Sequence, residues 1–180
     1  MTIQVIVLNG ASSSGKTSIA RCLQANLMTP WLRLGIDDLI RAMPDEGIED
    51  GSLLSISQAG QVEVGPGWRA LETSWNIGVA SIAVSGTGVI VDEVLLEGGA
   101  SQERLRTAFG GLEVFWVGVK CDDEVARARE ALRPDRVPGM AESQAAVLHE
   151  GVAYDLIVDT TNATSMSCAS EILAKTFTVA

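Results

Sequence analysis

Gly10-Ala11-Ser12-Ser13-Ser14-Gly15-Lys16-Thr17 stands near the start of this 180-residue chain. The stretch matches G-x-x-x-x-G-K-[ST] at every fixed position, which is the pattern of a phosphate-binding loop. Glycines at both ends allow a tight turn that aims backbone N–H groups at phosphates, and the following helix adds the partial positive charge of its N-terminus. We expect all eight residues to bind a nucleotide, with Lys16 reaching its β- and γ-phosphates and Thr17 ligating Mg²⁺.

The sequence on either side of this loop has the context that the motif requires. Residues 3–8 form an apolar run rich in β-branched side chains, which is typical of a buried strand. Apolar residues then recur at helical spacing over 17–27. Apolar strands and helices alternate to the end of the chain, which predicts a three-layer α/β fold with a mostly parallel five-stranded sheet.

The remaining elements follow from the same periodicities. Further strands of the sheet are expected at 31–36, 89–92, 113–119 and 155–158. Helices are expected at 37–43, from 66 onward, and at 100–109, 122–132 and 165–176. Residues 53–57 and 61–64 predict a small hairpin, whereas 44–51 is polar and rich in turn residues.

Composition restricts the class of protein. Hydrophobic residues make up 47% and charged residues 20%, which indicates one globular domain over 1–180. The formal charge of -10 disfavours nucleic acid and anionic membranes as partners. No apolar run is long enough to span a bilayer and no basic segment precedes the first strand, so we expect a cytoplasmic protein without a membrane partner. The three scattered cysteines indicate neither a disulfide framework nor a zinc site.

A carboxylate ends the apolar run that starts at Val89, where Asp92 follows three consecutive aliphatic residues. In a protein with a phosphate-binding loop, a carboxylate at the end of a core strand is typical of the residue that holds the water shell of Mg²⁺. We expect Asp92 to have this role. Glu93 competes for it, and a turn cap is the simpler interpretation of Asp92.

A phosphate-binding loop alone does not separate switch GTPases, ATPases and kinases. The guanine-specifying Asn-Lys-x-Asp is missing from the sequence, whereas a kinase needs a group that orients or deprotonates an acceptor hydroxyl. Asp37 follows the strand expected at 31–36, which places it at the carboxyl edge of the sheet, where ligands bind in open α/β folds. The alternative is that Asp37 or Asp38 caps the next helix, with Asp38 the better candidate for the cap.

Four of the 13 basic residues fall in a single stretch: Arg127, Arg129, Arg133 and Arg136. Guanidinium groups that close over a transferring phosphoryl group neutralise its developing charge. Proline and glycine residues from 134 to 139 indicate a loop, so we predict a lid over about 127–139 with Arg133 and Arg136 as catalytic groups. A salt-bridged helix face is the alternative, and for Arg127 it is the stronger one.

Many ordered matches make the chain resemble the chloramphenicol phosphotransferases over nearly its whole length. In the first half they include Ile6-Val7-Leu8-Asn9-Gly10, Arg21-Cys22-Leu23-Gln24, Pro30-Trp31-Leu32, Gly35-Ile36-Asp37-Asp38-Leu39-Ile40, Ala42-Met43-Pro44 and Arg69-Ala70-Leu71-Glu72. In the second half they include Gln102-Glu103-Arg104, Trp116-Val117-Gly118-Val119, Asp135-Arg136-Val137, Gly139-Met140-Ala141 and His149-Glu150-Gly151-Val152 with Tyr154-Asp155.

This resemblance implies a P-loop nucleotide-kinase fold, ATP with Mg²⁺, and phosphorylation of the primary hydroxyl of chloramphenicol, which inactivates the antibiotic. The proposed base of the family falls on Asp37, and its lid arginines fall on Arg133 and Arg136. The sequence departs from the family pattern at Asp38, at Asp92-Glu93 and at Pro134, and the divergent segment 45–60 is expected to border the acceptor pocket.

These departures affect the identity of the acceptor more than phosphoryl transfer itself. The sequence therefore predicts a kinase of a small hydroxylated molecule, with chloramphenicol 3-O-phosphotransferase as the leading interpretation. The alternatives are a kinase of another small alcohol, a nucleotide-binding regulatory module without transfer activity, and a nucleic-acid-dependent ATPase, which the acidic composition disfavours. The oligomeric state is left open.

Overall fold

The computed structural model describes residues 2–133 and 137–177. Within them, five parallel strands form one sheet in the order β2-β5-β1-β6-β7. The strands are β1 (Val5–Asn9), β2 (Leu32–Gly35), β5 (Val89–Glu93), β6 (Val114–Lys120) and β7 (Leu156–Asp159). The parallel five-stranded sheet expected from the sequence is confirmed.

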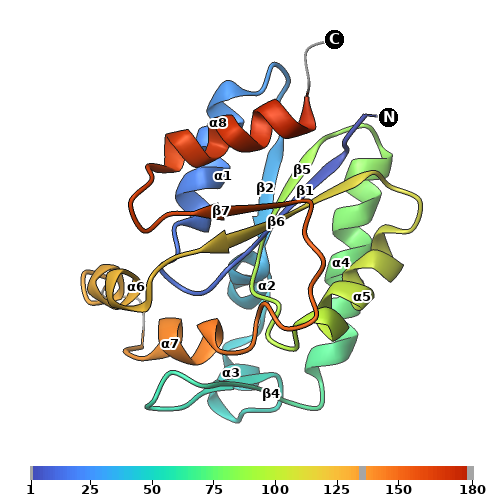
Figure 1. Cartoon of the computed structure of the whole chain (residues 1–180). Helices are drawn as coiled ribbons and strands as arrows, with labels where there is room; N and C mark the ends of the chain where they lie inside the picture. The colour runs from blue at the N-terminus through green and yellow to red at the C-terminus, as the bar shows by residue number, and fades with distance from the viewer. Residues whose placement is uncertain (1, 134–136, 178–180) are drawn as a thin grey trace.

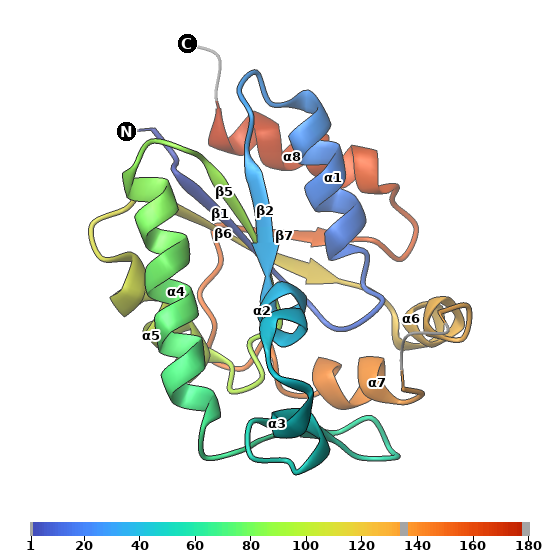
Figure 2. The ribbon, with the colours of Figure 1, turned by 180° about the vertical axis from the view of Figure 1, so that it is seen from behind.

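Helices cover both faces of this sheet (Figures 1 and 2). One face carries α1 (Lys16–Asn26) and α8 (Ser165–Thr176), and the other carries α4 (Trp68–Val84) and α5 (Gly99–Phe109). Successive side chains of a strand point to opposite faces of the sheet. In β1 both faces are covered, since all five of its residues are buried. Ile6 and Leu8 pack in the cluster that includes α1 and α8, whereas Val5 and Val7 pack in the cluster that includes α4 and α5. The fold therefore has three layers.

A smaller substructure lies beyond the carboxyl ends of the strands. It comprises α2 (Ile36–Ala42), α3 (Asp45–Glu49) and the antiparallel hairpin of β3 (Leu54–Ile56) and β4 (Val62–Val64). A third apolar cluster, which includes Leu39, Leu54 and Trp68, holds it against the start of α4. The hairpin expected from the sequence is confirmed.

Two short helices were not expected. The stretch 44–51 contains α3, which starts directly after Pro44 and has Asp45 and Glu46 in its first turn, both favourable at a helix N-terminus. The helix α7 (Met140–Ala145) follows Gly139, and α6 (Asp123–Glu130) packs against it. Both α3 and α7 are too short to show a clear apolar period. In the described part of the chain, the helices are also too short or too polar to cross a bilayer.

Candidate active site

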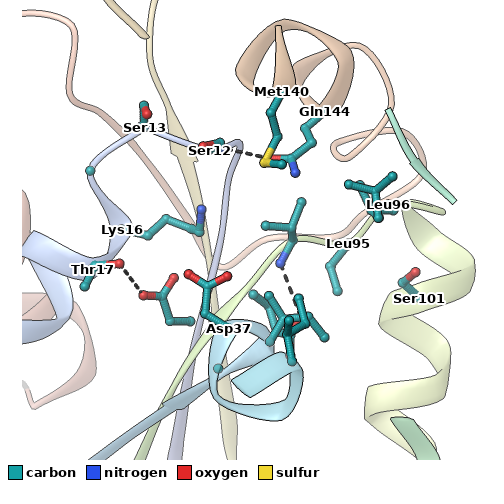
Figure 3. Close-up of a pocket in the computed structure, with 18 of the residues that line it drawn as sticks. Ser12, Ser13, Lys16, Thr17, Asp37, Leu95, Leu96, Ser101, Met140 and Gln144 are labelled. Atoms are coloured by element: carbon teal, nitrogen blue, oxygen red, sulfur yellow. Dashed lines mark hydrogen bonds between the residues drawn. The ribbon is translucent and has the colours of Figure 1, made fainter. Parts of the chain in front are cut away.

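A cavity of about 480 Å³ opens at the carboxyl edge of the sheet (Figure 3). The phosphate-binding loop forms one side of it, through Ser12, Ser13 and the residues from Gly15 to Ser18. The opposite side is formed by α2, the hairpin, the start of α4 and the segment that follows β5. Because β1 is central in the sheet, its loop leaves the sheet between β5 and β6, a position where parallel α/β folds bind ligands.

The loop has the backbone conformation of an anion cradle. Gly15 has φ 94° and Ser13 has φ 60°, so the chain turns sharply around residues 13–15. A Cβ atom on Gly10 would lie 2.5 Å from the carbonyl oxygen of Val119, so only glycine fits against β6 there. The Lys16 ammonium is buried and donates hydrogen bonds to the carbonyl oxygens of Gly10 (2.6 Å) and Ala11 (2.9 Å).

Polar groups of the loop are available to a ligand. The hydroxyls of Ser12, Ser13 and Ser14 are buried and make no hydrogen bond with the described part of the chain, and Ser12 and Ser13 line the cavity. The backbone N–H of Ser12 donates to the Gln144 side chain of α7 at 2.7 Å (Figure 3). Buried polar groups normally have partners, so this cluster of serine hydroxyls fits a site that an anion completes. Sequence reasoning missed Gln144 because nothing local marks a polar residue on a helix that was not expected.

Asp92, rather than Glu93, lies against the loop. The Thr17 hydroxyl donates a 2.7 Å hydrogen bond to Asp92 Oδ2, and the Arg33 guanidinium lies 3.8 Å from the same oxygen. Glu93 is buried beside it, and its carboxylate accepts a 3.2 Å hydrogen bond from the Val94 N–H. Burial raises the pKa of Glu93 to about 8, and the charges of Asp92 and Glu72 raise it further against the opposing effect of that hydrogen bond. Glu93 is therefore largely uncharged at neutral pH, unlike a typical ligand of Mg²⁺.

Asp37 and Asp38 have different surroundings. Asp38 accepts a 2.9 Å hydrogen bond from the N–H of Gly35, the residue that precedes α2, and it also pairs with Arg41 and Arg33. It thus performs the capping function that the sequence suggested for it. The Asp37 carboxylate lines the cavity and points toward the Lys16 ammonium across it (Figure 3). The structure therefore brings Asp37 and the phosphate-binding loop together at one site.

The basic stretch after β6 divides into separate environments. Arg133 lines the cavity, whereas Arg136 lies outside the described residues. Arg129, which also lines the cavity, donates to the carbonyl oxygen of Thr160 at 2.8 Å and to its hydroxyl at 3.1 Å. Arg127 is exposed and lies 3.4 Å from Glu142 of α7, in line with the salt-bridge alternative, although its partner is on another helix.

The side of the cavity away from the loop is apolar near the hairpin. Ile36 and Ile40 of α2 line it, together with Leu54, Ile56, Val62, Val64 and Trp68. Leu54 and Ile56 belong to the divergent segment 45–60, which was expected to border the acceptor pocket and does line this cavity. A hydroxylated molecule with an apolar body would fit here, with its hydroxyl near Asp37.

Comparison with known proteins agrees with this geometry. The sequence pattern of the family described as chloramphenicol phosphotransferase-like protein matches residues 3–177. This chain belongs to that family. A relative in Mycobacterium tuberculosis strain H37Rv, named "Putative O-phosphotransferase", is 32% identical over 174 residues, which cover 88% of this chain and 75% of the relative. The resemblance drawn from the sequence is confirmed.

Solved structures of P-loop kinases share the fold of this family member. An unliganded sugar kinase from Janibacter sp. HTCC2649 has a TM-score of 0.69 at 19% identity, covering 96% of this chain and 93% of that one. The Mycobacterium tuberculosis APS kinase CysC, solved with AMPPNP and APS, has a TM-score of 0.65 at 15% identity, covering 97% of each chain. Family and fold together identify the chain as an ATP-dependent kinase that phosphorylates a hydroxyl of a small molecule.

Proposed function

We propose that this protein is a chloramphenicol 3-O-phosphotransferase that inactivates the antibiotic. The observation that carries the proposal is the placement of Asp37 opposite Lys16 across one cavity whose wall near the hairpin is apolar (Figure 3). Chloramphenicol is an uncharged aryl diol, and such a molecule matches a cavity that has an apolar wall and a carboxylate beside the phosphate-binding loop. The family to which the chain belongs supports the same acceptor.

In this proposal the phosphate-binding loop holds the triphosphate of ATP. Lys16, the backbone N–H groups and the serine hydroxyls contact the phosphate oxygens. The Thr17 hydroxyl and the Asp92 carboxylate offer hard oxygen ligands 2.7 Å apart, a donor pair that suits Mg²⁺ and its water shell. When bound, Mg²⁺ would neutralise charge on the phosphates.

Asp37 acts on the acceptor. It orients the primary hydroxyl and accepts its proton as the hydroxyl oxygen forms a bond to the γ-phosphorus. The bond between that phosphorus and the β–γ bridging oxygen breaks, and ADP leaves with the electron pair. Arg133 stabilises the charge on the transferring group, and Arg136 is proposed to join it from the residues beyond those described. Residues 1–180 would form one kinase domain, with a lid over about 127–139.

Mass spectrometry after incubation with ATP, Mg²⁺ and chloramphenicol tests this function. The expected product is chloramphenicol carrying one added phosphoryl group, located on the primary hydroxyl by NMR. Phosphorylation of a different alcohol but not of chloramphenicol would support the kinase activity and show that the acceptor is another alcohol. ATP binding without transfer to any alcohol would favour a regulatory nucleotide-binding module.

A further inference from the structure

Asn76 is a nearly buried polar side chain that forms no side-chain hydrogen bond within the described part of the chain. It lies in the middle of α4, is only 6% exposed, and lines the cavity. Its carboxamide makes no hydrogen bond with the described part of the chain, although a carboxamide offers two donors and one acceptor. Its nitrogen and oxygen are not among the fully buried unpartnered atoms, so they stay open to the cavity, where a ligand can form hydrogen bonds with them.

The position of Asn76 on α4 relates it to the acceptor side of the cavity. Trp68, Glu72 and Asn76 are spaced four residues apart, lie on one face of the helix, and all line the cavity. At 1.5 Å per residue, Trp68 and Asn76 are separated by about 12 Å along the helix axis. That distance matches the length of a small aromatic alcohol, with Trp68 at the apolar end and Asn76 at the end nearer β5.

The charged groups on this wall are paired with one another. Arg69 lies 2.7 Å from Glu72 and also pairs with Glu97, while Arg104 lies 3.2 Å from Glu72 and 2.8 Å from Glu97. Two arginines are thus shared between two carboxylates, and the wall has no excess positive charge to attract a carboxylate ligand. A ligand group that reaches Asn76 is therefore best uncharged.

We propose that Asn76 determines acceptor specificity by hydrogen bonding to a second, uncharged polar group of the acceptor, either a hydroxyl or an amide. The acceptors selected in this way are uncharged alcohols that carry such a group in addition to the hydroxyl that is phosphorylated. The inference rests on the proposed transfer to a small alcohol, and it extends that function by naming the residue that discriminates among alcohols.

The variant Asn76→Leu separates this role from a structural one. Because the carboxamide has no hydrogen-bond partner among the described residues, its removal should leave the melting temperature of the ligand-free protein unchanged or higher. Chloramphenicol should bind about tenfold more weakly, through loss of one hydrogen bond. The expected kinetic result is a raised KM for chloramphenicol with the KM for ATP unchanged. Asn26→Leu, which removes an exposed carboxamide from the far end of α1, is the control for ligand binding and should change neither the affinity for chloramphenicol nor either KM.

Tryptophan fluorescence provides a binding measurement that does not depend on turnover, since Trp68 lines the cavity. The AMPPNP-loaded protein is titrated with three probes. Chloramphenicol is an uncharged diol that carries an amide, 1-phenyl-1,3-propanediol is an uncharged diol without an amide, and shikimate carries a carboxylate. We expect both uncharged probes to bind more tightly than shikimate. If Asn76 binds the amide, Asn76→Leu should weaken the binding of chloramphenicol more than that of the propanediol. If Asn76 binds a hydroxyl, the variant should weaken the binding of both probes equally.

Two results would overturn the inference. One is a lower melting temperature for Asn76→Leu with unchanged affinity for chloramphenicol and the propanediol, which would make Asn76 structural. The other is binding of shikimate in preference to both uncharged probes, or binding of neither uncharged probe. Binding of chloramphenicol that weakens in Asn76→Leu, without phosphorylation in the wild type, would refute the proposed reaction but retain the role of Asn76.

Discussion

Thr17 donates a hydrogen bond to Asp92 across 2.7 Å, which ties the first turn of α1 to the end of β5. Arg33 of β2 lies 3.8 Å from the same carboxylate oxygen, so Asp92 is fixed from two directions. Contacts from α1 and β2 thus fix the orientation of the Asp92 carboxylate at the end of β5, beside the phosphate-binding loop. A carboxylate held in this way is ready to receive a metal–nucleotide complex without rearranging.

The variant Asp92→Asn tests this arrangement. Asparagine keeps the shape and can still accept the hydrogen bond from Thr17, but it loses the charge that attracts Mg²⁺. We expect the Mg²⁺ concentration that gives half-maximal turnover to rise by about 10–100-fold. A Mg²⁺ titration at fixed ATP measures it. Glu93→Gln is the comparison, because burial keeps the Glu93 carboxyl largely protonated. A larger shift in Glu93→Gln than in Asp92→Asn would assign the metal role to Glu93.

The adjacent aspartates provide a second test. Asp37→Asn should lower kcat by about 10²–10⁴-fold, because the acceptor hydroxyl loses the group that takes its proton. The dissociation constant for ATP should not change. Asp38→Asn is the matched variant: it weakens the contact with the Gly35 N–H and the pairs with Arg33 and Arg41, so it should lower the melting temperature while largely keeping kcat. Unchanged turnover in Asp37→Asn would remove Asp37 from the mechanism.

The sequence predicts much of the fold because its strongest signals are local. The apolar strand, the glycine-rich loop and the amphipathic helix around Lys16 each follow from residues close together in the chain, and the alternating strands and helices follow from period alone. The helices α3 and α7 could not be predicted in this way because they contain only five and six residues. Their stability comes from contacts with distant segments, such as Glu130 accepting the N–H groups of Gly139 and Ala141.

The candidate site was predictable only where a motif or a strand end marks it. Asp37 and Asp92 each follow or end an apolar strand, so topology alone brings them to the carboxyl edge. Asn76 and Arg33 carry no such mark: Asn76 is one of several polar residues of α4, and its burial depends on how α4 is rotated against the sheet. The role of Arg136 stays a prediction from the sequence, because it lies outside the described residues.

Close approach of β2 to β5 leads to a stability prediction. A Cβ atom on Gly35 would lie 2.3 Å from the Asp92 carbonyl oxygen, whereas one on Gly78, in α4, would meet nothing within 4 Å. Gly35→Ala should therefore destabilise the protein by about 1–3 kcal/mol, because backbone has to move. Gly78→Ala should stabilise it by about 0.5–1 kcal/mol through higher helix propensity. Urea denaturation of both variants checks the pair, and equal stabilities for the two would show that β2 and β5 are less closely packed than described.

His149 is the single histidine of the chain and contacts the Tyr154 hydroxyl, 2.6 Å from its Nδ1. Asn9 donates to the same hydroxyl at 2.6 Å, so Tyr154 links the two side chains. Burial lowers the pKa of His149, and the charges of Lys120 and Lys16 lower it further. When the pH falls below 6.5, the pKa of an ordinary histidine, the imidazole becomes protonated in the unfolded chain before it does so in the folded chain. The free energy of unfolding therefore decreases as the pH falls through this range.

An NMR titration of this ring measures the effect directly, because there is one histidine signal to follow. We expect the pKa of the wild-type imidazole to lie below 6.5, because burial and the charges of Lys120 and Lys16 disfavour its protonated form. As the pH is lowered from 8 to 5.5, the melting temperature of His149→Gln should rise relative to that of the wild type. The reason is that the variant has no histidine whose protonation favours the unfolded chain. A wild-type pKa at or above 6.5 would contradict this account of His149.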